Sequence, residues 1–183
     1  MSKLSLLKLL QVSDSAFPSG SFAFSNGLET IVKESHFENI RDLEDLMIDQ
    51  VAARWFEFDR YFINQAFLCA GSISELKNLD VSCHIQNTNE ALALASRQIG
   101  RSLITVHKKL QTKGIIEFSN AVYQGGNIEE AGYEPVVRGL IGWSLDLSQG
   151  ETEIGALFGT VSAFSSAAVR MNIIGALEAQ QII

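Results

Sequence analysis

A regular stripe of apolar residues between positions 40 and 66 restricts this chain more than any other feature. Its members recur at steps of three and four and are Ile40, Leu43, Leu46, Met47, Val51, Trp55, Phe58, Phe62 and Ala66. This spacing is typical of an amphipathic helix, and most of the charged residues in the same stretch fall at other positions. The pattern therefore predicts one long helix that begins near Asn39, with Asn39 as its N-cap.

Similar patterns predict helices along the rest of the chain. The expected ranges are Leu4–Val12, Phe22–Glu34, a short helix from Ser72, Asn87–Lys113 with Gly114 as its C-cap, Ile116–Tyr123, Val136–Leu147, Ile154–Arg170 and Asn172–Ile183. Ser72 with Glu75, and Ser148 with Glu151, have the spacing of a capping box. Gln124–Gly132 is expected to be a Gly-rich loop, and no alternating strand pattern is found. We therefore expect an all-α fold, a single domain over residues 1–183 with roughly eight to ten helices in one compact bundle.

Composition excludes several classes of protein. With 183 residues and only two prolines, the chain can build one sizeable core from long helices. A net charge of −7 argues against a nucleic-acid-binding protein, which needs a basic face. The two cysteines, Cys69 and Cys83, do not form a disulfide framework, so we expect a cytoplasmic protein. The uncharged stretch 154–169 is shorter than the roughly 20 residues of a membrane span, and we interpret it as a core helix.

The sequence lacks the usual patterns of a reaction centre. His36, His84 and His107 do not have the i, i+4 spacing of a helical metal site, and no Cys-x-x-Cys pair is present. We also find no Gly-x-Ser-x-Gly elbow and no Gly-rich phosphate loop. The chain is therefore predicted not to be an enzyme. The many small residues of the C-terminal helices indicate either tight internal packing or a subunit interface.

The segment Ser13–Glu29 has a pattern that an ordinary loop lacks. Three phenylalanines lie near Pro18 and Gly20 in the sequence. The proline fixes its own backbone φ angle, and the glycine can take backbone angles that other residues avoid. Gly27 lies in a helical pattern, where glycine costs about 1 kcal/mol relative to alanine. Such a segment is either a helix–loop–helix corner buried in its own domain or a recognition surface.

Four sequence blocks, in order along the chain, resemble the UreF family, urease accessory protein F. They are Leu9–Phe22 continuing through Ser25–Glu29, Ser96–Leu103, Tyr133–Gly139 and Ser166–Gly175. Members of the family usually continue beyond the last block, so we expect this chain to lack their C-terminal tail.

The resemblance implies an all-α homodimer that works in urease maturation. It implies binding to urease accessory protein D (H in some systems), to the accessory GTPase G and to apo-urease, with no membrane or nucleic-acid partner. No cofactor is expected to be stably bound, and nickel is handled only within the complex. Two alternatives stay open: a GTPase-activating regulator with a catalytic arginine, for which Arg138 and Arg170 are candidates, and a nickel-binding carrier.

The expected site is a partner-binding surface with no catalytic residue and no metal ligand. Its candidate residues are Phe17, Pro18, Gly20, Phe22, Phe24, Ser25, Gly27, Leu28, Glu29 and Arg170.

Overall fold

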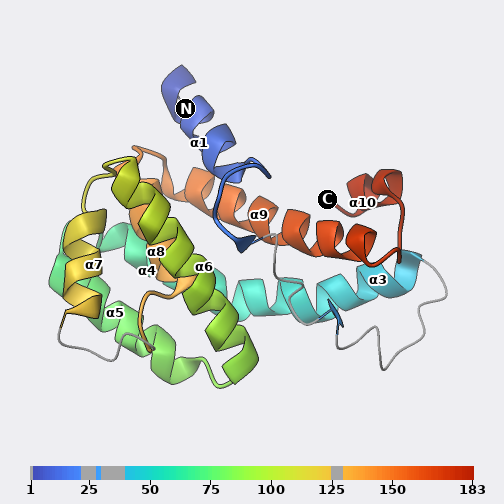
Figure 1. The fold of residues 1–183 in the computed structure, drawn as a ribbon, viewed down its shortest axis with the longest axis horizontal. Helices are drawn as coiled ribbons and strands as arrows, with labels where there is room; N and C mark the ends of the chain where they lie inside the picture. The colour runs from blue at the N-terminus through green and yellow to red at the C-terminus, as the bar shows by residue number, and fades with distance from the viewer. Residues whose placement is uncertain (1, 22–27, 30–39, 125–129) are drawn as a thin grey trace.

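The computed structural model describes residues 2–21, 28–29, 40–124 and 130–183 (Figure 1). These residues form eight continuous helical segments and no strand, which confirms the expected all-α fold. The elements are α1 (Lys3–Ser13), α3 (Ile40–Leu46), η2 (Met47–Ala52), η3 (Trp55–Asp59), α4 (Arg60–Leu68), α5 (Ile73–Gln86), α6 (Glu90–Lys109), α7 (Ile115–Tyr123), α8 (Glu134–Ser144), α9 (Gln149–Arg170) and α10 (Ala176–Ile182).

The long predicted helix is confirmed, but two stretches of it are π-helical. The elements α3, η2, η3 and α4 follow one another as a single helix, in which η2 and η3 are wider turns. The apolar stripe explains why such turns fit here. Leu43, Met47, Val51 and Trp55 recur at steps of four, which drift by about 40° per step around an α-helix. Wider turns reduce that drift and keep Leu43, Val51 and Trp55 buried. Asn39, the predicted N-cap, lies outside the described residues.

Three helix boundaries in the middle of the chain differ from the prediction, and one of them is the start of α6, which is Glu90 rather than Asn87. The helix after Ser72 is not short, because α5 runs for 14 residues. The predicted helix to Lys113 ends instead at Lys109, because Gln111 takes a left-handed conformation and the Thr112 N–H donates to the carbonyl of His107. Gly114 is therefore not the C-cap of α6 but the N-cap of α7.

The C-terminal helices follow the prediction with shifted ends. Ser148 and Glu151 form the expected capping box, so α9 begins directly after Ser148. The helix predicted from Asn172 starts later, at Ala176, because Asn172 is left-handed and terminates α9. The helix predicted from Val136 starts earlier, with Pro135 in its first turn.

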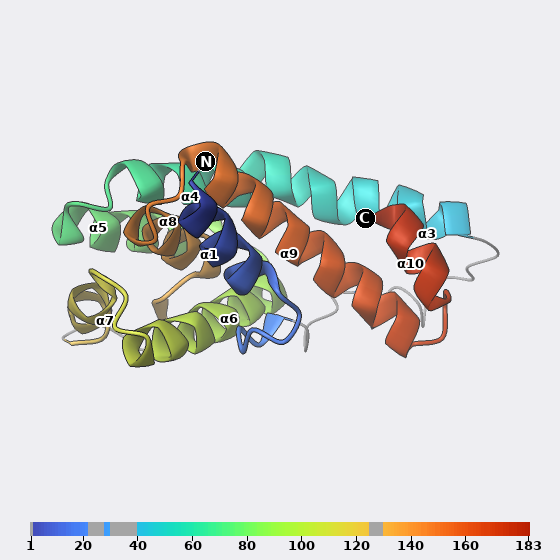
Figure 2. The same ribbon diagram turned by 90° about the horizontal axis from the view of Figure 1, so that it is seen from above.

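Three hydrophobic clusters hold the helices together. The largest joins α4, α5, α6, α7 and α8 at one end of the molecule. A second, smaller cluster joins α3, η2, the last turns of α9 and α10 at the other end, and Leu28 is part of it. Between them, Trp55 and Ile63 pack against Ala156 of α9. Figure 2 shows α9 crossing the molecule alongside the long helix that contains α3 and α4.

The small residues of α8 and α9 serve internal packing. A side chain at Gly139 would collide with the carbonyl of Ile63, so α8 lies directly against the backbone of α4. A Cβ at Gly155 would lie 2.6 Å from Leu9 Cδ1, so α1 rests closely on α9. For Gly155, one of the small residues of the C-terminal helices, the packing interpretation is confirmed. Among the residues that the structure describes, we find no helix with both the length and the apolar character needed to cross a bilayer.

Candidate functional site

The segment singled out by the sequence begins as a tight turn that packs on α6. Asp14 ends α1, and its carbonyl accepts a hydrogen bond from the Phe17 N–H at 3.0 Å. The ring of Phe17 then lies against the imidazole of His107, with centroids 5.5 Å apart. Gly20 adopts a left-handed conformation, with φ at 77°, and a Cβ there would lie 3.2 Å from Ser102 Oγ. The turn is therefore fixed against α6 at two points.

The candidate residues of this segment separate into a buried and an exposed group. Phe17 and Leu28 are buried, Leu28 completely, so they anchor the segment by packing in the core. Pro18, Gly20, Glu29 and Arg170 are exposed, and Arg170 is the last residue of α9. Four further candidates lie outside the described residues: Phe22, Phe24, Ser25 and Gly27. The exposed group is the part that a partner protein can touch directly.

His107, which supports Phe17, is a buried and neutral side chain. Its Nδ1 shares a hydrogen bond of 2.8 Å with Thr112 Oγ1, and its Nε2 has no hydrogen-bond partner among the described residues. Burial, with a smaller contribution from the nearby positive charge of Arg138, lowers the pKa of His107 to about 4. At neutral pH the imidazole therefore supports the corner as a packed ring and carries no charge.

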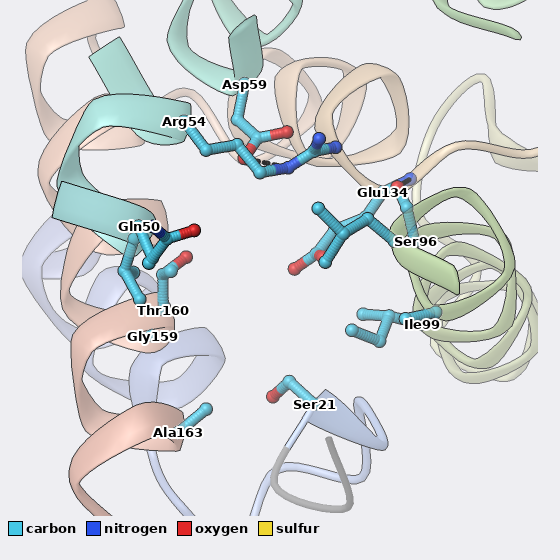
Figure 3. A pocket seen from close by; sticks show the side chains of 13 residues that line it. Ser21, Gln50, Arg54, Asp59, Ser96, Ile99, Glu134, Gly159, Thr160 and Ala163 are labelled. Atoms are coloured by element: carbon cyan, nitrogen blue, oxygen red, sulfur yellow. Dashed lines mark hydrogen bonds and ion pairs between the residues drawn. The ribbon is translucent and has the colours of Figure 1, made fainter. Parts of the chain in front are cut away.

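A cavity of about 90 Å³ lies at the centre of the molecule, between the long helix, α6, α8 and α9 (Figure 3). Its lining residues are Ser21, Gln50, Val51, Arg54, Asp59, Leu92, Ala95, Ser96, Ile99, Glu134, Gly159, Thr160 and Ala163. Figure 3 shows Arg54 and Asp59 facing Ser96 and Glu134 across the space. Ser21 lines one side of it, which places the middle of the Ser13–Glu29 segment at the edge of the cavity.

Two ion pairs set the electrostatics of this cavity. Arg54 Nε lies 3.4 Å from Asp59 Oδ2, and Arg138 Nε donates to Glu134 Oε1 at 2.7 Å. Burial raises the pKa of Asp59 from 3.8 to about 7. Arg54 and Arg138 oppose that increase and the negative charge of Glu134 adds to it. Asp59 lies in the wall of the cavity, where its side chain is 22% exposed and paired with Arg54.

A network of hydrogen bonds fixes the chain as it approaches α8. The buried carboxylate of Asp80 accepts hydrogen bonds from the N–H groups of Gly132 and Tyr133, at 2.8 and 2.9 Å. The Tyr133 hydroxyl in turn bonds Arg97 Nη1 and His84 Nδ1, each at 2.8 Å. Burial raises the pKa of Asp80 to about 6, opposed by those two backbone donors. This network holds the first turn of α8, and hence Glu134, in place.

The four sequence blocks are connected by contacts in the fold although they are far apart in the chain. The first block contacts the second where Gly20 approaches Ser102. The second contacts the third through the Arg97–Tyr133 hydrogen bond. The first also contacts the fourth, because Leu28 belongs to the same cluster as the last turns of α9. The residues that carry the resemblance therefore form one connected structure.

Sequence reasoning missed the charged residues of the cavity. Arg54 and Asp59 are five residues apart, a spacing that places side chains on different sides of an α-helix. The four-residue steps of the apolar stripe were the available signal that this helix contains wider turns. Asp80 gave no signal, because one acidic residue in a helix is ordinarily solvated.

Arg138, a candidate catalytic arginine, is not an exposed finger. Its side chain is 13% exposed and paired with Glu134. In the described ranges, no group of three or more His, Cys, Asp or Glu side chains is arranged to hold a metal ion.

The sequence, compared with those of known proteins, matches the model of one family. The sequence profile of the UreF family matches residues 38–183. The chain belongs to the UreF family. It is 30% identical over 183 residues to urease accessory protein UreF of Trichodesmium erythraeum, a match covering 97% of this chain and 76% of the relative. It is 28% identical over 182 residues to the UreF protein of Bacillus sp. TB-90, covering 97% and 78%. It is 24% identical over 179 residues to the UreF protein of Haemophilus influenzae Rd, covering 96% and 74%.

Proposed function

We propose that this chain is a non-enzymatic scaffold in urease maturation. It recruits the accessory GTPase G and accessory protein D (or H) to apo-urease, and it does so in the cytoplasm as a homodimer. Membership of the UreF family supports a role in urease maturation. The observation that carries the scaffold role is the convergence of the four blocks, which leaves Pro18, Glu29 and Arg170 exposed on a rigid support.

The exposed apolar side chains of α1 also suit a protein-binding role. This helix projects from the bundle, has no buried residue and exposes Leu4, Leu7 and Leu10 by 58–63%. Clustered apolar side chains on a surface are typical of sites that a partner covers. The proposed scaffold therefore offers α1 and the corner after it as one continuous binding region.

Nickel is cargo in this proposal and is not a resident cofactor. The chain alone is expected to bind nickel weakly, and the ion is handled within the assembled complex. Isothermal titration calorimetry with nickel and the isolated chain tests this point. Tight stoichiometric binding would favour the carrier alternative instead.

Co-purification with proteins D and G tests recruitment. We expect the wild-type chain to recover both partners, and Pro18→Ala or Arg170→Ala to reduce recovery of at least one, because both side chains are exposed and their loss leaves the core intact. Lys108→Ala, at an exposed position near the end of α6, is the matched control and should recover both. If the wild-type chain recovers neither partner, the scaffold proposal fails.

Exposure of Arg170 also favours a second candidate, a regulator that supplies this arginine to the GTPase. GTP hydrolysis by the complex separates the two functions. Loss of hydrolysis with retained binding in Arg170→Ala, and no rescue by Arg170→Lys, would support a catalytic arginine. Loss of binding itself would support the scaffold.

A further inference from the structure

The hydroxyl group of Tyr133 lies between two nitrogen atoms from different helices. Tyr133 is completely buried, and its hydroxyl oxygen lies 2.8 Å from Arg97 Nη1 of α6 and 2.8 Å from His84 Nδ1 of α5. Within the part of the chain that the structure describes, this hydroxyl has no third partner. Tyr133 directly precedes α8, so these two bonds hold the start of α8 against α5 and α6.

The charge of Arg97 fixes the direction of both hydrogen bonds. A guanidinium group stays protonated and can only donate, so Arg97 donates to the Tyr133 oxygen. The hydroxyl hydrogen then has His84 Nδ1 as its acceptor. The opposite arrangement, with a hydrogen on Nδ1, would leave the hydroxyl hydrogen buried and unpaired, which is costly. His84 is therefore neutral, with its own hydrogen on Nε2.

We propose that His84 and Tyr133 form a proton-sensitive clasp between α5 and the chain that enters α8. With His84 neutral the clasp is closed, because Nδ1 accepts the hydroxyl hydrogen. A proton on Nδ1 removes that acceptor and places a positive charge near Arg97, since both nitrogen atoms lie 2.8 Å from the same oxygen. Acid therefore favours an open state in which residues 130–133 separate from α5. The clasp is a property of the isolated chain and does not depend on the proposed scaffold function.

The charged groups around His84 leave this direction unchanged. They are two of each sign: Lys77 and Asp80 of its own helix, Glu130 of the following loop, and Arg97 of α6, which is also paired with Glu90. From α7, the cavity beside His84 receives only the uncharged Val122. Glu130 lies 3.9 Å from Nε2 but is 54% exposed, so water screens its attraction for a proton on the imidazole. The lost acceptor therefore decides the direction.

The other titratable groups at the clasp keep their protons or act in the opposite sense. Burial raises the pKa of the Cys83 thiol and of the Tyr133 hydroxyl, so both stay neutral between pH 5 and 8. Burial also raises the pKa of Asp80 to about 6. Asp80 alone would make the closed state more stable as pH falls, which is the reverse of the effect of His84. The test must therefore isolate the contribution of His84.

Proton linkage gives the sign of that contribution. In the open state His84 is solvated, and a solvated histidine has a pKa near 6.5. The closed state uses the Nδ1 lone pair for Tyr133 and binds the proton less tightly. Opening should therefore be independent of His84 protonation above about pH 7.5 and become easier as pH falls below about 6.5.

Hydrogen exchange measured by mass spectrometry between pH 5 and 8 tests the clasp. His84→Asn is the reference, because its amide oxygen can replace Nδ1 as an acceptor and it is neutral at every pH. Exchange rates of peptides within 130–140, corrected for intrinsic rates, are expressed as the ratio of wild type to His84→Asn. Asp80 is present in both proteins, so its effect cancels in the ratio. We expect the ratio to be constant above about pH 7.5 and to rise by up to about tenfold per pH unit below about 6.5.

Tyr133→Phe separates the role of the hydroxyl from simple charge repulsion. The same ratio is measured with Tyr133→Phe in both proteins, and it should no longer depend on pH because no hydroxyl hydrogen needs an acceptor. A rise that persists would show that His84 acts only through its charge and would overturn the proposal. Peptides within α9 are the internal control, and their ratio should stay constant. An equal rise there would mean that the whole bundle opens, which would also overturn the clasp.

NMR spectroscopy of the chain labelled with nitrogen-15 at histidine gives a second, direct reading. At pH 8 the ring nitrogen shifts distinguish the two tautomers, and the signal that disappears in His84→Asn belongs to His84. We expect the hydrogen on Nε2. A hydrogen on Nδ1 would overturn the proposal, as would an exchange ratio that is flat from pH 5 to 8.

Discussion

At the scale of single residues, His107 illustrates how burial controls charge in this bundle. The side chain is 1% exposed and its pKa is lowered to about 4. The unfolded chain, with a histidine pKa near 6.5, binds the proton more readily. His107 therefore costs no stability above pH 6.5, and its penalty grows as pH falls from 6.5 towards 4.

We expect His107→Gln to remove this acid sensitivity. The free energy of unfolding of the wild-type chain minus that of His107→Gln should fall by up to about 3 kcal/mol between pH 7 and pH 4. Urea unfolding at several pH values measures it, and the subtraction cancels the opposite effects of Asp59 and Asp80. A difference for His107→Gln that does not change with pH would contradict the prediction.

At the scale of elements, periodicity predicted the helices well and their ends less well. The apolar stripe was sufficient to predict the long helix, and the capping box was sufficient to predict the start of α9, because both depend on local spacing. The end of α6 was not predictable, because the left-handed residue that follows it is Gln111, a residue type that seldom takes this conformation, while Gly114, also left-handed, begins α7. The cavity charges were also missed, because Arg54 and Asp59 meet only on π-helical turns.

Contact between α6 and the start of α8 gives a prediction about packing. A Cβ on Gly100 would collide with the Gly132 carbonyl and would lie 3.0 Å from the Glu134 nitrogen, and both are backbone atoms that cannot rotate away. Gly100→Ala should therefore lower the free energy of unfolding by roughly 1–3 kcal/mol. Gly150→Ala, a helical position with nothing within 4 Å of the new Cβ, should be neutral or gain up to about 1 kcal/mol. Urea unfolding measures the free energy of unfolding of both variants. Equal changes in Gly100→Ala and Gly150→Ala would contradict the close approach of α6 to the start of α8.

At the scale of the whole molecule, the position of the cavity follows from how the hydrophobic clusters are divided. The large cluster holds α4 to α8 and the smaller one holds α3, η2, α10 and the end of α9. Among the described residues, a small cluster around Trp55 lies between them, and the cavity lies beside it, where η3, α8 and α9 meet. Regions with fewer buried contacts open at lower free energy. We therefore expect the two ends of the molecule to differ in local stability.

Truncating one phenylalanine in each large cluster tests this division. Phe164, 1% exposed, belongs to the smaller cluster and Phe118, fully buried, to the larger one. Either change to Ala should cost about 3–5 kcal/mol locally. Hydrogen exchange of Phe164→Ala should accelerate in α3, η2 and α10 while α4 and α8 keep their protection, because the larger cluster is intact. Phe118→Ala should accelerate exchange at both ends, since the smaller cluster has too few contacts to persist alone. Uniform acceleration in Phe164→Ala would instead mean that the clusters unfold as one unit, so that any movement of the cavity wall would need the whole bundle to open.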